Sequence, residues 1–545
     1  MKQWMYTYRY EWALFLILVL ATILVQPFGN FPLNDDWAYA KPLVGMLNGQ
    51  KFSIGECPAM TLVTHLLWGA LFAKVGGFSF EILRLSSLVA SFIGLIVLFK
   101  IIKQISSNPL LALLGSMVYL FTPVYFNLSY TFMTEITFST WLLCGCYFAF
   151  RYFNTGSKAA FFYVYFFSLL LLFNRQFGIM LPLSFLGINL LFDKQKKWSV
   201  TLGLIFIILL VMALKWYEGY LHQVLPENAS YKYSGGINPF MRVFWDNIFK
   251  NARLRYATVL LHSFIFILPF ALFFFIPLWK QTPKITRWLA LMISFPLAYF
   301  LFQKEPFPMG NIFVNMHLGA ETFFECLSQE TTNYTTHTRT EWFNQVSHWT
   351  MITGMAGMIM ILFFLLHKLW NGSANPGSDR PGKFFIWTLF GFYTLLIFLT
   401  ESYFDRYHVP LIVLGIILVS FFSKGAEPYF MPGVTVILLL VYISVAGTKD
   451  YFTVQTKKWE AYAYLRDTMK VEKEEINGGY ELNGWNEGKP SAWYQFLFLK
   501  DYKYLIQYSP EPGFRLLKSY EFRRCFPFKK DKINIFVKDS IKTYD

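Results

Sequence analysis

Blocks of apolar residues alternate with short polar segments along most of the chain, and each block is about 15–20 residues long. An α-helix of that length can cross the ~30 Å hydrocarbon core of a bilayer. Loops and open sheet edges cannot, because every backbone polar group in lipid must be hydrogen-bonded within the crossing element. The pattern predicts about thirteen spanning helices. Their ranges are 12–28, 84–101, 109–124, 134–151, 160–173, 177–192, 199–216, 258–278, 287–302, 349–368, 384–400, 408–423 and 429–447.

Basic residues in the short loops predict the orientation of these spans. If the basic N-terminus is cytoplasmic, every short loop on the same side carries Lys or Arg, as the positive-inside rule requires. The long loops, about residues 29–83, 217–257 and 303–348, then lie outside the cytoplasm, together with everything after Gly447. A multi-pass membrane protein is therefore predicted, with a cytoplasmic N-terminus and a C-terminal region on the opposite side, periplasmic or extracellular.

The segment from Met60 to Gly77 is apolar enough to be a further span. Counting it as one would invert all later loops and place their basic residues outside. We therefore predict an amphipathic or re-entrant helix at the outer membrane surface, which contains His65 and Trp68.

Beyond about Thr448 the chain becomes rich in Lys, Glu and Tyr, and short alternating runs separated by glycine pairs indicate strands. The predicted fold is mainly α. It consists of a polytopic transmembrane helical bundle at residues 1–447, with long extracytoplasmic loops, and a small extracytoplasmic α/β domain at residues 448–545.

The composition excludes an ordinary soluble protein. Of 545 residues, 55% are hydrophobic and only 15% are charged, whereas about 25% is usual in soluble domains. The formal net charge of +15 is accounted for by the cytoplasmic loops, so no nucleic-acid partner is predicted. The five cysteines show neither metal-ligand spacing with histidine nor a disulfide framework.

Several charged residues lie at the predicted outer ends of the spans. Asp35 and Asp36 follow the first span, and Glu135 begins a later one. Acidic residues there are typical helix caps, so a structural role is one interpretation. Three arginines, Arg84, Arg175 and Arg406, also lie at outer ends. They could contact lipid headgroups, or they could bind a lipid phosphate through paired, charge-assisted hydrogen bonds.

The order of short motifs carries a family resemblance. The first outer loop contains Asp35-Asp36-Trp37-Ala38-Tyr39, which is similar to an Asp-Glu-x-x-Tyr signature with Asp in place of Glu. The later motifs are Leu83-Arg84-Leu85-Ser86-Ser87, Thr134-Glu135, Asn174-Arg175-Gln176-Phe177-Gly178 with Pro182, Gly310-Asn311, Phe404-Asp405-Arg406-Tyr407-His408-Val409-Pro410, and Gly478-Gly479-Tyr480-Glu481-Leu482-Asn483-Gly484-Trp485. Together they resemble the GT-C class of glycosyltransferases. The likeness is greatest to the family 39-like bacterial proteins related to protein O-mannosyltransferases and to the aminoarabinose transferase of lipid A.

This resemblance implies transfer of a sugar from a polyprenyl-phosphate-linked donor to an extracytoplasmic lipid, polysaccharide or protein acceptor, with inversion at the anomeric carbon. It implies that a carboxylate accepts the proton of the acceptor hydroxyl. By position in the motif this base is Asp35, with Asp36 as the alternative and Glu135 as a second acidic candidate. The candidates for binding the donor phosphate are Arg84, Arg175, Arg406 and Tyr407. The candidates for a substrate groove are Tyr39, His65 and Trp68.

Other functions stay open at this stage. No cofactor is predicted with certainty; a divalent cation between paired carboxylates is left open, and no metal ligand is assigned. A transporter or flippase of lipid-linked glycans would need charged groups near the middle of the bilayer, whereas here they lie near span ends. A glycan ligase or polymerase of another family and a non-catalytic scaffold are further alternatives.

Overall fold

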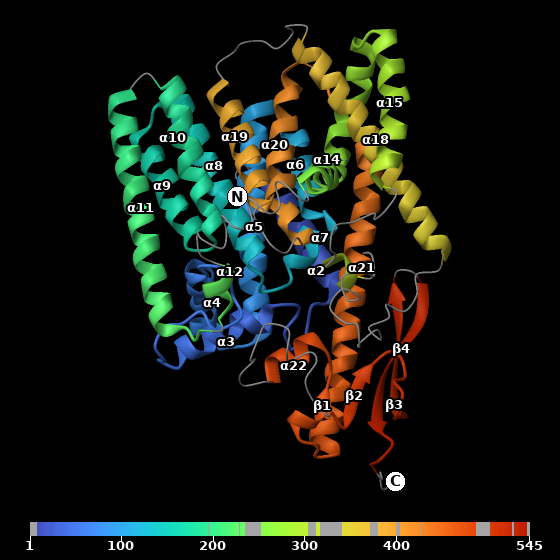
Figure 1. Ribbon diagram of the computed structural model, residues 1–545. Helices are drawn as coiled ribbons and strands as arrows, with labels where there is room; N and C mark the ends of the chain where they lie inside the picture. The colour runs from blue at the N-terminus through green and yellow to red at the C-terminus, as the bar shows by residue number, and fades with distance from the viewer. Residues whose placement is uncertain are drawn as a thin grey trace.

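The computed structural model describes most of the chain. The described residues are 8–193, 196–227, 229–234, 252–302, 312–316, 341–370, 380–398, 404–425, 427–486, 502–525 and 528–541. Long helices make up most of this part, and a small sheet lies near the C-terminal end (Figure 1).

Each of the thirteen predicted spans coincides with a helix. These helices are α2 (Arg9–Val25), α5 (Phe80–Ser106), α6 (Pro109–Leu120), α8 (Thr134–Thr155), α9 (Lys158–Leu172), α10 (Met180–Phe192), α11 (Lys196–Val224), α14 (Ala252–Gln281), α15 (Lys284–Phe302), α18 (Glu341–Trp370), α19 (Arg380–Phe398), α20 (Val409–Ser420) and α21 (Met431–Ala463). In the described part of the chain, five helical stretches are long and apolar enough to cross a membrane. They are Phe80–Ser106, Lys197–Val224, Ser263–Gln281, Asp405–Ser423 and Met431–Thr468. The count of thirteen spans and their orientation stay predictions.

Shorter elements connect the long helices. They are α3 (Asp36–Leu47), α4 (Val63–Gly76), α7 (Pro123–Leu128), η1 (Gln176–Ile179), α12 (Ser230–Ser234), α16 (Ile312–Asn315), η2 (Asp405–His408), η3 (Phe421–Gly425), η4 (Tyr464–Thr468), η5 (Lys473–Glu475) and α22 (Tyr480–Asn486). Within the segment from Met60 to Gly77, residues Val63–Gly76 form the helix α4, and its place at the outer membrane surface stays a prediction.

Local sequence signals explain where several helices begin. The side chains of Ser79, Asn108 and Ser157 accept hydrogen bonds from the backbone N–H groups of Ile82, Leu111 and Ala160. Each bond satisfies one of the donors that the first turn of a helix leaves without an internal partner.

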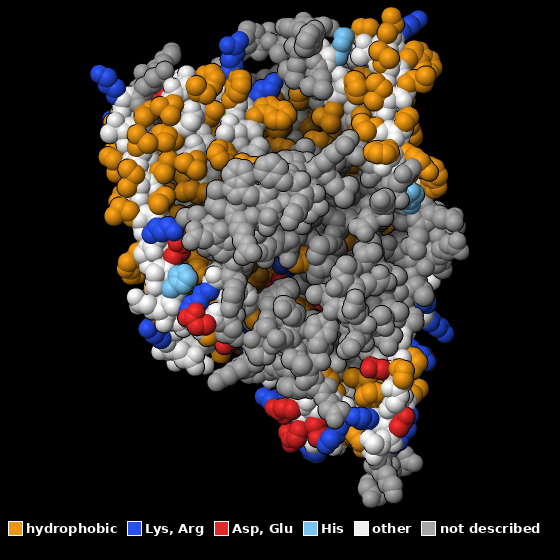
Figure 2. Space-filling model, viewed as in Figure 1, with side chains coloured by type: hydrophobic (Ala, Val, Ile, Leu, Met, Phe, Trp, Pro, Cys, Tyr) orange, Lys and Arg blue, Asp and Glu red, His pale blue; other side chains and the backbone are white. Residues whose placement is uncertain are grey.

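The outward faces of the long helices are apolar. On α11, Leu204, Ile208 and Met212 are exposed, and on α15 Trp288 and Met292 are exposed. Figure 2 shows hydrophobic side chains over the helices in its upper half, whereas many charged side chains gather at the lower end. An exposed apolar surface of this kind is costly in water and favourable against lipid, so it fits a membrane-embedded bundle.

The C-terminal sheet has the strand order β1-β2-β4-β3. Its strands are β1 (Ile476–Asn477), β2 (Tyr504–Gln507), β3 (Phe514–Cys525) and β4 (Phe528–Lys538). The β1–β2 pair is parallel and the other two pairs are antiparallel. Helix α21 runs without a break through the predicted domain boundary at residue 447, and its last turns share a hydrophobic core with the sheet. The division into two domains stays a prediction.

The segments around the first outer loop meet at one end of the bundle. Helices α3, α4, α12 and α22 and the sheet all lie at the lower end in Figure 1. The start of α4 and the residue before it are held there by backbone hydrogen bonds from Leu62 N to Asn174 O (3.1 Å) and from Thr64 N to Phe173 O (3.0 Å). These bonds bring the start of α4 against the turn that carries Arg175.

Candidate active site

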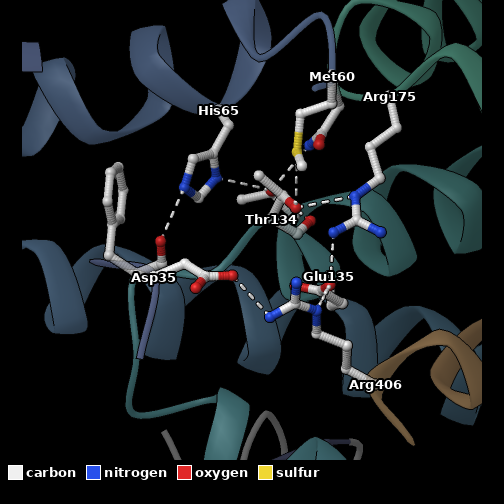
Figure 3. Close-up of polar contacts among 10 residues, drawn as sticks. Asp35, Met60, His65, Thr134, Glu135, Arg175 and Arg406 are labelled. Carbon is white, nitrogen blue, oxygen red and sulfur yellow. Dashed lines mark hydrogen bonds and ion pairs between the residues drawn. The ribbon is translucent and has the colours of Figure 1, made fainter. Parts of the chain in front are cut away.

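Four of the predicted charged residues form one buried cluster. Asp35 precedes α3, Glu135 lies in the first turn of α8, Arg175 precedes η1, and Arg406 lies in η2. We call these four residues the charged cluster. Their exposed fractions are between 2% and 7%. Figure 3 shows Arg175 and Arg406 approaching Glu135 from opposite sides, with Asp35 beyond Arg406.

Asp35 receives a hydrogen bond on each carboxylate oxygen. Arg406 Nη1 donates to Oδ2 at 2.7 Å, and the Tyr480 hydroxyl donates to Oδ1 at 2.5 Å. The residue occupies the N-cap position of α3, yet its side chain makes no capping hydrogen bond. The helix-cap interpretation of Asp35 is therefore wrong, and its carboxylate instead connects distant parts of the chain.

Glu135 lies between the two arginines. Arg175 Nη2 donates a short hydrogen bond to Oε1, and Arg406 Nε lies 3.3 Å from the same oxygen. Arg175 Nε also donates to Thr134 Oγ1 at 2.8 Å. Two carboxylates and two guanidinium groups balance one another, which makes burial of all four charges tolerable.

Aromatic rings surround the guanidinium groups of the cluster. The Arg406 guanidinium carbon lies 4.6 Å from the centroid of the Phe404 ring and 5.9 Å from that of Tyr407. The Arg175 guanidinium carbon lies 5.8 Å from the Tyr407 centroid. Such cation–π contacts hold a guanidinium group in place while leaving N–H donors available at its edge.

Asp36 has a different environment, although it is the next residue. It is fully buried, and its two oxygens accept backbone N–H bonds from Leu33 (3.2 Å) and Phe132 (2.8 Å). Burial raises the pKa of Asp36 to about 8, against the lowering effects of the Arg84 charge and the two N–H donors. Asp36 thus joins the first outer loop to the segment before α8.

Arg84 also holds the backbone near Asp35 in place. Its guanidinium group donates to the backbone carbonyls of Gly29 (2.5 Å), Phe31 and Pro27 (3.4 Å). The guanidinium carbon also lies about 5 Å from the ring centroids of Phe31 and Phe452. The structure therefore brings Arg175 and Arg406 together on Glu135, whereas Arg84 holds the chain that leads from α2 to Asp35.

The three predicted groove residues are packed inside the protein. His65 is buried, with Nδ1 3.0 Å from Thr137 Oγ1 and Nε2 3.2 Å from the Phe132 carbonyl oxygen. Burial lowers the pKa of His65 to about 3, so its imidazole is neutral at physiological pH. The Tyr39 ring meets His65 edge-on at 5.8 Å between centroids, and Trp68 Nε1 donates to Ser86 O at 2.9 Å. Contact of these residues with a substrate stays a prediction.

Sequence reasoning missed one member of the site, Tyr480. The motif from Gly478 to Trp485 contributes to the family resemblance, but nothing in its spacing places it beside Asp35. The motif Gly310-Asn311 lies outside the described residues. Among the residues that the structure describes, no group of three or more His, Cys, Asp or Glu side chains could hold a metal ion.

Comparison with known proteins shows that one segment of the chain is similar to a protein family. Residues 63–216 match the family model described as dolichyl-phosphate-mannose-protein mannosyltransferase. The predicted resemblance to GT-C glycosyltransferases is confirmed. The matched segment, residues 63–216, includes Arg84, Glu135 and Arg175, while Asp35 precedes it and Arg406 follows it in the sequence. No match was found among curated proteins.

Two solved structures, both of ArnT from Cupriavidus metallidurans, align with this chain over nearly its whole length. The apo structure has a TM-score of 0.42 and 10% identity, and the similarity covers 98% of this chain and 99% of that one. The structure bound to undecaprenyl phosphate has a TM-score of 0.39 and 11% identity, with 97% and 99% coverage.

Proposed function

We propose that this protein is an integral membrane glycosyltransferase that moves a sugar from a polyprenyl-phosphate-linked donor to an acceptor outside the cytoplasm. The observation that carries the proposal is the charged cluster, in which Asp35, the predicted base, and Glu135 both contact the guanidinium group of Arg406. The family match over residues 63–216 supports the reaction class. The membrane environment is supported by the long apolar helices.

Asp35, rather than Asp36, is the proposed general base. The hydrogen bonds described for Asp36 come from backbone N–H groups, whereas Asp35 is ion-paired with Arg406, one of the two guanidinium groups that would receive the leaving phosphate. In the proposed step the acceptor hydroxyl oxygen bonds to the anomeric carbon while its proton passes to the Asp35 carboxylate. The bond between that carbon and the phosphate oxygen breaks, and its electron pair leaves with the lipid phosphate. Direct displacement of this kind inverts the anomeric centre.

Arg175 and Arg406, with Tyr407 between them, are the proposed phosphate-binding residues. A guanidinium group has five N–H donors in a planar fork. Arg406 uses two nitrogen atoms in ion pairs, and Arg175 uses one in an ion pair and one in a hydrogen bond to Thr134. The donors at the remaining edge can stabilise the charge that grows on the phosphate as it leaves. Arg84 is not included in this proposal, because its guanidinium group is bound to backbone carbonyls.

Glu135 is the proposed partner of the sugar. Among the described residues, its Oε2 is buried without a hydrogen-bond donor. A sugar hydroxyl placed against Oε2 would satisfy this oxygen, and the nearby negative charge would stabilise an oxocarbenium-like transition state.

The location of the reaction is also proposed. The donor tail keeps the substrate in the bilayer, so the site has to meet it at headgroup depth. We propose a bacterial inner membrane, with the charged cluster and the C-terminal sheet on the periplasmic or extracellular side, where a lipid, polysaccharide or protein supplies the acceptor hydroxyl.

Transfer assays with a panel of donors test the proposal. The purified protein in lipid nanodiscs would be given polyprenyl-phosphate hexoses and pentoses, and release of polyprenyl phosphate would be measured with and without a membrane extract as the acceptor source. We expect release from at least one donor. Asp35→Asn should lower its rate by roughly 10²–10⁴-fold, the usual contribution of a general base.

The control is Glu460→Gln, which removes a carboxylate from an exposed pair with Lys457. It should leave the rate unchanged. Full activity in Asp35→Asn would exclude the proposed base. Movement of intact lipid-linked sugar across the bilayer without release of polyprenyl phosphate would instead indicate a flippase.

A further inference from the structure

The C-terminal motif from Gly478 to Trp485 docks directly onto the helix that follows Asp35. Lys41 Nζ donates to the Gly484 carbonyl oxygen at 2.6 Å, and the rings of Trp37 and Tyr480 meet edge-on with centroids 5.8 Å apart. A Cβ atom added at Gly484 would lie 2.3 Å from a ring atom of Trp37. Only glycine therefore permits this close approach, and the docking depends on the motif's own sequence.

The same motif is also tied to the residue before Asp35. Glu481 Oε1 accepts hydrogen bonds from the Tyr451 hydroxyl (3.0 Å) and from Gln455 Nε2 (3.0 Å). The Tyr451 hydroxyl in turn accepts a bond from the backbone N–H of Asn34 at 3.1 Å. Residues about 450 positions later in the sequence thus hold the chain on both sides of Asp35.

We propose that Tyr480 is a positioning residue for the base: its hydroxyl and the Arg406 guanidinium hold the two oxygens of Asp35, so that the C-terminal region completes the active site. The inference rests on the proposed function. Each carboxylate oxygen has two lone pairs, so an acceptor hydroxyl can still donate to Asp35 while both contacts are kept.

Two properties of Tyr480 suit this role. Burial and the nearby Asp35 charge raise its pKa well above the ordinary value of 10.0, so its hydroxyl keeps its proton and acts as a donor. Its ring is held by Trp37, so the hydroxyl is aimed by packing as well as by the hydrogen bond. A donor fixed in this way makes a charge-assisted hydrogen bond that fixes the orientation of the carboxylate.

The test is Tyr480→Phe, with Tyr451→Phe as the matched control. Both variants lose one buried hydroxyl that ties the motif to the first outer loop, but only Tyr480 touches Asp35. We expect thermal midpoints to fall in both. In Tyr480→Phe alone, kcat should fall by roughly tenfold to a hundredfold, as expected for loss of a charge-assisted hydrogen bond. The acidic limb of its pH–rate profile should also move to higher pH, because a carboxylate that loses a donor binds a proton more readily.

An infrared titration gives a readout that needs no substrate. The carboxyl band that disappears in Asp35→Asn should titrate at higher pH in Tyr480→Phe than in the native protein, and should not move in Tyr451→Phe. Equal kinetic effects and no such shift would mean that Tyr480 only docks the motif. Faster transfer by Tyr480→Phe would mean that its hydroxyl blocks the acceptor position. Either result overturns the inference, whereas failure of the proposed function would appear in Asp35→Asn.

Discussion

Asp35 and Asp36 are neighbours in the sequence, but their carboxylates lie in two different regions of the molecule. Asp35 contacts side chains from the late part of the chain, Arg406 and Tyr480. Asp36 accepts hydrogen bonds from the backbone N–H groups of Leu33 and of Phe132, which lies 96 positions later in the sequence. One region has opposed charges that a substrate could engage, and the other has a carboxyl group committed to holding the backbone. Residue type alone therefore does not assign a catalytic role.

The largest effect should come from exchanging each aspartate for asparagine and comparing transfer rates per folded molecule. Asp35→Asn should lose roughly 10²–10⁴-fold in rate, because an amide cannot accept the acceptor proton. Asp36→Asn should lose less than tenfold once the folded fraction is measured by gel filtration and near-ultraviolet circular dichroism. Equal losses in the two variants would remove the distinction between the two regions.

Removal of Arg406 should destabilise the charged cluster strongly. Arg406→Ala leaves Asp35 and Glu135 buried without this shared partner, which typically costs about 3–5 kcal/mol of unfolding free energy. Denaturant titration in detergent would measure the loss. Arg406→Lys keeps a positive charge and should recover part of the stability. It should not restore simultaneous contact with Asp35 and Glu135 through two different nitrogen atoms. A loss under 1 kcal/mol in Arg406→Ala would argue against a tightly coupled cluster.

Asp36→Asn should have a smaller effect on stability, of about 1–3 kcal/mol. An amide nitrogen would face either the Leu33 or the Phe132 backbone N–H, and that buried donor would lose its partner. Thermal unfolding followed by tryptophan fluorescence would measure the change. Glu460→Gln, on the exposed helix surface, is the comparison and should change the midpoint little. Similar midpoints for both variants would contradict the bracing role of Asp36.

A further expected effect is the pH dependence that Asp36 adds to the stability of the folded protein. Its pKa is about 8 in the folded protein and 3.8 ordinarily, so between these values the folded state holds a proton that the unfolded chain has released. The stabilising contribution is complete below about pH 4 and is lost as pH rises toward 8. The thermal midpoint should therefore decline less steeply from pH 5 to 8 in Asp36→Asn than in the native protein. Identical slopes would show that Asp36 is ionised throughout this range.

Much of the helical architecture was readable from the sequence. Every predicted span overlaps a helix of the structure, because a segment that crosses lipid has to satisfy its own backbone hydrogen bonds. The same reasoning was weaker at the domain boundary, since α21 continues through residue 447 into the region that supports the sheet. A helix can pass from apolar to polar surroundings without a break, so a change of composition does not end it.

The candidate site was predicted only as a set of residues at the outer ends of spans. Local sequence identified Asp35, Glu135, Arg175 and Arg406 because charged residues are rare beside apolar blocks. Local sequence also grouped Arg84 with the other two arginines. In the structure its guanidinium group donates to three backbone carbonyls between α2 and α3. Tyr480 belongs to a motif that contributes to the family resemblance, but no spacing along the chain indicates that its neighbour is Asp35, 445 positions earlier.

By itself, the sequence determined that this protein is helical, membrane-embedded and similar to GT-C glycosyltransferases. The lengths of the apolar blocks and the order of the motifs can be read along the chain without knowing which segments pack together. Only the tertiary structure decided which aspartate meets the arginines and which braces the backbone. The contacts of Asp35 join residues separated by 371 and 445 positions. Pairings over such distances depend on how helices pack against one another, and no periodicity along the chain encodes that packing.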